Sequence, residues 1–234
     1  MSPPPEVRVG VDHSRDVLRF VRAERWAHGV AGVLTLVCIV TAAILYNGMF
    51  AVLIGNRRLV ELVHVWSGFA LPVPLLVALL SRAYRSDLRR LGRFVAEDWL
   101  WLRSARRRAR ADGVGKFNAG QKLNGSLSAG SILVLLGTGT IMFFTGLAPL
   151  AQRTGATFVH DWFALAFGLL VVGHVVKALR DPQAMRGIRT GWVHRAWVHH
   201  EHPSWESELA ERANPDRGTG ARAPERERPP PPQE

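Results

Sequence analysis

The chain has 234 residues, of which 47 % are hydrophobic, and it carries a formal net charge of +11. Its mean hydropathy is close to zero, as in a soluble protein, but that average hides a segregation of apolar from charged residues. The one cysteine, Cys38, excludes an intramolecular disulfide, a CxxC metal site and covalent haem attachment through a CxxCH motif.

The N-terminal arm, residues 1–25, is polar and has no apolar signal-peptide core ahead of the first hydrophobic run. We therefore expect the first membrane span to act as an uncleaved signal anchor.

Four long apolar runs follow this arm. No Asp, Glu, Lys or Arg occurs in 26–56, 62–81 or 123–152, and Asp161 is the one charged residue of 154–176. A helix needs about 20 apolar residues to cross the hydrocarbon core of a bilayer, so each run is long enough. The sequence predicts an all-α membrane protein, a four-helix transmembrane bundle in residues 26–180, with spans at about 27–47, 60–81, 122–145 and 157–179.

The distribution of positive charge predicts the orientation of the bundle. Of the 30 Lys and Arg residues, 27 lie in residues 1–26, in the loop 82–122 and in the tail from Lys177. The positive-inside rule then places both termini and this loop of the multi-pass protein in the cytoplasm. We expect the arginine-rich loop to meet anionic lipid headgroups and not nucleic acid.

The segments outside the spans have three predicted roles. Amphipathic helices on the membrane surface are predicted in 94–113 and 185–200, the second anchored by Trp192 and Trp197. Residues 181–208 form a cytoplasmic surface segment. Residues 209–234 become rich in Pro, Arg and Glu after Asn214 and are predicted to be disordered.

Five of the nine histidines lie outside the spans, and we interpret them as solvated: His13, His194, His199, His200 and His202. The other four lie in or at the edge of spans, where an ionisable side chain is costly and needs a partner inside the bundle. By depth these four form two pairs, His64 with His160 near the outer surface and His28 with His174 near the cytoplasmic surface.

The fourth span carries one histidine of each pair. Fourteen residues separate His160 from His174, which is a rise of about 21 Å along a helix. The same spacing leaves the two side chains about 40° apart, on one face. Two imidazoles that face each other across an apolar gap suit the axial ligation of a haem b, so the sequence predicts two stacked haem sites.

These histidines have other interpretations. Single histidines at helix ends are often interfacial hydrogen-bonding groups. Zinc favours four ligands gathered together, and a proton relay needs carboxylates in mid-membrane, which the spans lack.

Two further sets of residues have two open interpretations each. Small residues in the first and third spans either make room for haem or pack helices closely: Gly29, Gly32, Ser126, Gly130 and Gly137. Arg22 and Arg25, beside His28, either pair with haem propionates or act as topology signals.

Several motifs resemble the cytochrome b (gamma) subunit of respiratory formate dehydrogenases, a family of di-haem four-helix membrane cytochromes b. The similar segments are "RAERWAHG", "VHVWSG", "VHDWFAL" and "GHVVKAL" around the four histidines, "GKFNAGQKLN" before the third span, and "HRAWVHHEHPSWESE" in the tail. The similarity covers about residues 15 to 208, and "KFNAGQK" is its most specific part.

The resemblance implies cofactors, partners and a location in the bacterial inner membrane. It implies two haems b, one held by His64 and His160 and the other by His28 and His174, with menaquinone bound by Asn118, Gly120 and Gln121. It also implies an iron–sulfur beta subunit and a catalytic alpha subunit outside the membrane, because one cysteine cannot supply their ligands. Without the resemblance, Asn118 is a plausible helix N-cap.

The predicted function is therefore electron transfer from a periplasmic formate dehydrogenase through two haems b to menaquinone on the cytoplasmic side. The alternatives are the cytochrome b subunit of another respiratory enzyme, such as a nickel–iron hydrogenase, and a free-standing cytochrome b561-type quinone oxidoreductase. A haem-free transporter or assembly factor is a third.

Overall fold

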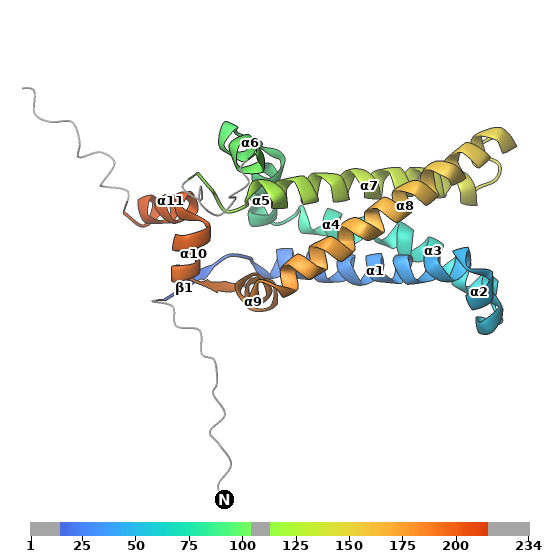
Figure 1. Cartoon of the computed structure of the whole chain (residues 1–234), viewed down its shortest axis with the longest axis horizontal. Coiled ribbons are helices and arrows are strands. Elements are labelled where there is room, and N and C mark those ends of the chain that lie inside the picture. Colours follow the sequence, from blue (N-terminus) through green and yellow to red (C-terminus); the bar gives the residue numbers. More distant parts are fainter. Residues whose placement is uncertain (1–14, 104–112, 215–234) are drawn as a thin grey trace, which may run out of the picture.

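A computed structural model describes residues 15–103 and 113–214, and in it four helical segments are long and apolar enough to cross a membrane. They are α1 (Arg22–Tyr46), α3 with α4 (Arg57–Ala70 and Pro72–Ala78), α7 (Ala119–Phe143) and α8 (Leu150–Leu179). They lie along one another as a bundle, with α8 crossing the others obliquely (Figure 1). The predicted all-α, four-span fold is confirmed.

The second span differs from the single helix predicted at 60–81. It starts at Arg57, where the side chain of Asn56 accepts a hydrogen bond from the Leu59 N–H at 3.0 Å. It is then interrupted at Leu71, between α3 and α4. Pro72 and Pro74 explain the break, because a proline within a helix donates no backbone hydrogen bond and crowds the preceding turn.

The two ends of the bundle differ in chemistry. We call the "turn end" the end with the short helix α2 (Gly48–Ile54) and the α7–α8 connection, 144–149. The "polar end" holds the remaining elements: α5 (Arg82–Gly92), α6 (Ala96–Arg103), α9 (Pro182–Thr190), α10 (Arg195–Glu201), α11 (Pro203–Ala213) and two strands.

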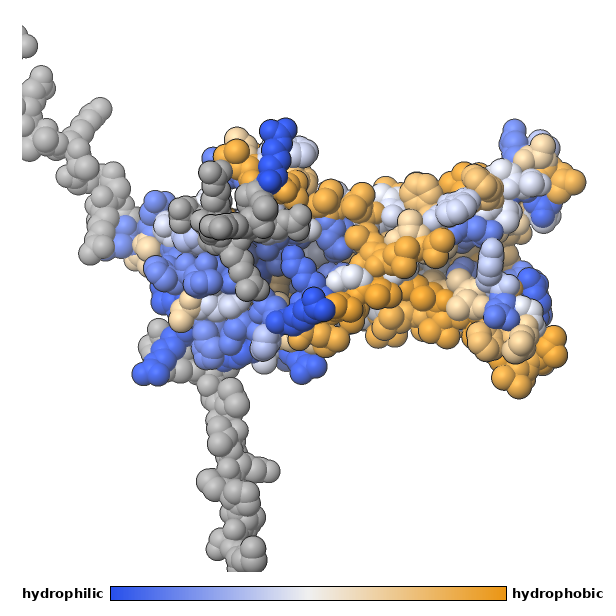
Figure 2. Space-filling model, in the orientation of Figure 1, coloured by the Kyte–Doolittle hydropathy of each residue, from blue (hydrophilic) through white to orange (hydrophobic). Residues whose placement is uncertain are grey.

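Apolar side chains cover the outside of the bundle between these ends. Figure 2 shows hydrophobic residues along the middle of the visible face and hydrophilic ones gathered over the polar end. Large apolar side chains such as Leu133, Leu165 and Leu169 are more than half exposed. A surface of this kind needs lipid around it, because a soluble monomer rarely exposes so large a contiguous apolar area.

The polar end contains a small folded unit that the sequence patterns did not predict. Strand β1 (Asp16–Leu18), in the predicted arm, pairs antiparallel with β2 (Trp192–His194), so that Val17 lies opposite Val193. The predicted surface helix in 185–200 is therefore wrong as one element, because β2 separates α9 from α10. Trp197 packs against a buried apolar cluster here instead of acting as an isolated anchor: Val17, Val193, Val198 and Trp205.

Ion pairs hold the polar end together and join it to the bundle. Both oxygens of Asp16 accept hydrogen bonds from Arg186, at 2.8 and 2.7 Å, and this bidentate pairing lowers the pKa of the buried Asp16 carboxyl. Lys122 at the start of α7 donates to Asp98 of α6 at 2.6 Å in a buried pair. Lys116 pairs in the same way with Asp87 of α5.

The predicted start of the disordered tail at residue 209 lies inside a helix. Helix α11 continues to Ala213, because Trp205 is buried and Glu208 is held by both Arg90 and Arg212. Residues 215–234, the rest of that predicted segment, lie outside the described residues. The predicted helix in 94–113 is described only as α6, since 104–112 also lie outside.

Candidate functional site

The four histidines predicted as haem ligands come together in the two pairs that their depths indicated. The ring centres of His64 on α3 and His160 on α8 are 6.3 Å apart, and this is the turn-end pair. The ring centres of His28 on α1 and His174 on α8 are 6.1 Å apart, and this is the polar-end pair. Helix α8 thus supplies one histidine to each level of the bundle.

Both separations fit two imidazoles that share one metal ion. Metal–nitrogen bonds of about 2 Å on opposite sides of an ion put the ligating nitrogens about 4 Å apart and the ring centres about 6 Å apart. Within residues 15–103 and 113–214, no three His, Cys, Asp or Glu side chains are grouped so that they could hold a metal ion. Two histidines per site suit axial haem ligation better than a tetrahedral zinc site.

Two threonine hydroxyls form hydrogen bonds with the turn-end histidines. The Thr41 hydroxyl lies 2.9 Å from Nδ1 of His64, and the Thr138 hydroxyl lies 3.0 Å from Nδ1 of His160. These hydrogen bonds involve Nδ1 of each ring, so Nε2 is the ring nitrogen that remains to bind a metal ion. Neither threonine stands out in the sequence, because α1 and α7 contain other threonines and α7 also contains several serines.

The polar-end pair has a different environment. Both His28 and His174 are exposed in this structure, whereas His64 and His160 are partly buried. Among the described residues no hydrogen bond reaches either polar-end imidazole. The two candidate sites are therefore chemically distinct.

The glycines beside these levels do not pack helices closely. A Cβ atom added at Gly29, Gly32, Gly130 or Gly137 would meet no described heavy atom within 4 Å. Open space beside these four glycines does not support the interpretation that they pack helices closely. Gly139 differs, since an added Cβ would lie 3.4 Å from Cε1 of His160, so this glycine lets the imidazole approach α7.

The residues predicted to bind quinone lie at the start of α7, at the polar end. Asn118 and Gln121 form a reciprocal capping box: the Asn118 side-chain oxygen accepts from Gln121 N–H at 2.9 Å, and the Gln121 oxygen accepts from Asn118 N–H at 3.0 Å. The helix-cap interpretation of Asn118 is thus correct. The capping box still leaves the two amide nitrogens to donate to a ligand.

Two side chains that were not predicted to belong to this site lie close to Gly120. A Cβ added at Gly120 would lie 3.3 Å from Cη2 of Trp101 and 3.5 Å from Nζ of Lys177. A cavity of about 250 Å³ adjoins this point, and its lining includes Trp101, Asp98 and Ala119. An aromatic ring, a lysine and two amide groups therefore surround the beginning of α7.

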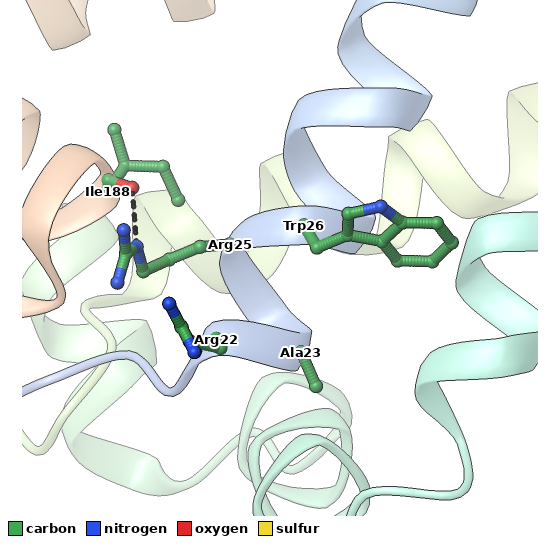
Figure 3. A pocket seen from close by; sticks show the side chains of 5 residues that line it. All are labelled: Arg22, Ala23, Arg25, Trp26 and Ile188. Atoms are coloured by element: carbon green, nitrogen blue, oxygen red, sulfur yellow. Dashed lines mark hydrogen bonds between the residues drawn. The ribbon is translucent and has the colours of Figure 1, made fainter.

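Arg25 forms hydrogen bonds with the polar end. It donates to the last carbonyls of α9, at 3.2 Å to Ile188, 2.5 Å to Arg189 and 2.9 Å to Thr190. Figure 3 shows this side chain turned toward Ile188, with Trp26 directed elsewhere. Its guanidinium thus stabilises the negative end of the α9 dipole, a role that neither proposed interpretation included.

The sequence pattern of the family described as prokaryotic cytochrome b561 matches residues 19–190. The chain belongs to this family. The match spans all four membrane helices and all four paired histidines. Membership implies haem b as cofactor and a multi-pass protein of the inner membrane.

Curated relatives of this cytochrome b561-family protein come from enteric bacteria. It is 21 % identical over 207 residues to the Escherichia coli K12 protein "Formate dehydrogenase, cytochrome b556(fdo) subunit", covering 82 % of this chain and 93 % of the relative. It is 29 % identical over 99 residues to the nitrate-inducible formate dehydrogenase cytochrome b556(Fdn) subunit of the same strain, covering 41 % and 46 %.

One tail histidine of this cytochrome is buried, although it was predicted to be solvated. His194, His199 and His200 are exposed, but His202 is buried and lies 2.6 Å through Nδ1 from the Gly115 carbonyl. Burial, with the nearby positive charge of Arg19, lowers the pKa of His202 from 6.5 to about 3. A neutral His202 therefore joins the tail to the loop that leads into α7.

Proposed function

We propose that this chain is the membrane cytochrome b subunit of a formate dehydrogenase, carrying electrons from a periplasmic catalytic partner to menaquinone at the cytoplasmic face. The observation that carries the proposal is the pair of histidine sites at two levels of one bundle, each with the ring separation expected for axial ligation. The names of the curated relatives support formate as the electron source.

In this proposal, His64 and His160 hold one haem b, and His28 and His174 hold a second. The bound haems supply reversible one-electron transfer, with potentials that their axial ligands and surroundings adjust. The protein contributes position: α8 carries a ligand for each site, while α1 and α3 supply the opposite ones.

Menaquinone binds at the start of α7 in this proposal. Asn118 and Gln121 donate amide hydrogens to a quinone carbonyl, and Gly120 lets the ring approach the backbone. Trp101 offers a flat apolar surface, and Lys177 a positive charge 3.5 Å from the Gly120 Cβ position. This set lies at the same end as His28 and His174, so electrons would have a short path to the quinone.

The orientation is proposed from charge. The basic polar end faces the cytoplasm, which is the arrangement that the positive-inside rule favours. The turn end then faces the periplasm, where an iron–sulfur beta subunit and a catalytic alpha subunit would deliver electrons near His64 and His160.

A haem assay on the purified full-length chain tests this function. We expect two haems b per chain in a pyridine haemochromogen assay, and one haem in each of His64→Ala and His28→Ala. The matched control is His200→Ala, because His200 is exposed and bonds to its neighbour Glu201. Wild-type protein with no haem, or a His64→Ala variant that keeps two, would contradict the assignment.

Purification from native membranes tests the partner. Copurification of a formate-oxidising enzyme with iron–sulfur clusters supports the proposal. Copurification of a nickel–iron hydrogenase would instead assign this cytochrome to that enzyme. Quinone reduction by the isolated chain would favour a free-standing oxidoreductase.

A further inference from the structure

The turn-end histidines form hydrogen bonds with hydroxyl groups from the two spanning helices that do not carry these histidines. Thr41 is on α1 and Thr138 is on α7, whereas His64 and His160 are on α3 and α8. All four spanning segments thus contribute a side chain to this level. The polar-end pair draws its two histidines from α1 and α8.

The threonine geometry determines which ring nitrogen carries the proton. The Thr41 hydroxyl has one hydrogen, and it donates that hydrogen to the Val37 carbonyl at 2.7 Å. Thr138 donates in the same way to the Val134 carbonyl at 2.7 Å. Each hydroxyl oxygen is therefore an acceptor toward its histidine, and the nitrogen facing it must carry a hydrogen.

A second acceptor supports this assignment at His64. Nδ1 of His64 also lies 3.2 Å from the Cys38 carbonyl oxygen, which can only accept. A nitrogen between two acceptors is an N–H donor. His64 is then the Nδ1–H tautomer, and Nε2 keeps the lone pair that a metal needs.

We propose that Thr41 and Thr138 are positioning residues that hold His64 and His160 as Nδ1–H tautomers and present both Nε2 atoms to one haem iron. This inference rests on the proposed haem ligation. An imidazole whose N–H donates a hydrogen bond is a stronger donor to metal, so the threonines favour the oxidised iron. The turn-end haem thereby gains a lower potential than the same ligand pair would have without them.

A redox titration of the full-length, haem-loaded chain tests the inference, with the two midpoint potentials followed optically and by EPR of the low-spin ferric signals. The isosteric changes Thr41→Val and Thr138→Val remove the hydroxyl. We expect each to raise one midpoint potential and shift one ferric signal, while the other haem is unchanged. Thr41→Ser and Thr138→Ser should restore both readouts.

Thr140→Val is the matched control. The Thr140 hydroxyl donates to the Leu136 carbonyl of its own helix at 2.7 Å. Among the described residues it forms no hydrogen bond with a histidine. Its loss should leave both potentials unchanged.

The outcomes separate this inference from the proposed function. Wild-type protein without two haems overturns both. Two haems whose potentials and ferric signals are unmoved in Thr41→Val and Thr138→Val overturn the threonine role alone. Should a valine variant lose one haem, its recovery in the matching serine variant supports the role, and failure of serine to recover it overturns the role.

Discussion

His28 of α1 and His174 of α8 lie 146 positions apart in sequence, yet their ring centres are 6.1 Å apart at the polar end of the bundle. The His64–His160 pair repeats this relationship at the turn end, at 6.3 Å. Since α8 carries one histidine of each pair, the fourteen-residue spacing of His160 and His174 sets the distance between the two sites.

The two histidines of one pair should act as a unit. We expect His160→Ala to lose the same haem as His64→Ala, and the double variant to lose no more than either single one, because either change removes one axial ligand of a shared iron. Haem content and the remaining midpoint potential are the measurements. A double variant with no haem would show that the four histidines do not divide into these pairs.

The capping and quinone-binding roles of Asn118 can be separated. Asn118→Asp keeps a side-chain acceptor for the Gln121 N–H but loses the amide donor, and Asn118→Ser is a neutral capping control. We expect both variants to keep the wild-type thermal stability and to reduce menaquinone analogues about tenfold more slowly, as for one lost hydrogen bond.

Asn118→Ala should lose both properties, with about 1 kcal/mol of stability removed with the cap. Unchanged quinone reduction in Asn118→Asp and Asn118→Ser would restrict Asn118 to its structural role.

The burial of His202 should make the stability of the folded protein depend on pH. Its pKa is about 3 in the folded protein and 6.5 as the ordinary value, so the unfolded chain binds more protons between these pH values. Stability should therefore be full above about pH 6.5 and fall as the pH is lowered toward 3.

Thermal unfolding of the detergent-solubilised protein between pH 7 and pH 5 measures this loss. His202→Gln, which keeps a donor toward the Gly115 carbonyl but does not titrate, should show a smaller change over the same range. An equal change in both proteins would assign the acid sensitivity to other groups.

Gly191 should tolerate no side chain. It ends α9 in the left-handed region, with φ at 93°, and a Cβ there would lie 2.6 Å from the Phe20 carbonyl oxygen. Gly191→Ala should cost at least about 1–3 kcal/mol, the usual penalty of a non-glycine residue in strained backbone. Gly146→Ala is the control, because an added Cβ there meets nothing within 4 Å. Unfolding temperatures of the two variants would be compared.

The four spans and the levels of the histidines follow from the amino-acid sequence. Uncharged runs such as 123–152 exclude burial in a small soluble domain, and the period of a helix places His160 and His174 on one face at two depths. These features depend only on composition and local repeat, which a single sequence contains in full. Pro72 and Pro74 also marked the break in the second span, although the prediction did not use them.

Tertiary structure alone decided the contacts between distant segments. The pairing of Val17 with Val193, the burial of His202 against Gly115 and the hydrogen bonds from Thr41 and Thr138 each join residues far apart in the chain. Local patterns describe a strand of three residues or a threonine in a span equally well in many surroundings. Their partners follow from how whole helices pack, so the polar end and the threonine contacts became visible only when the chain was folded.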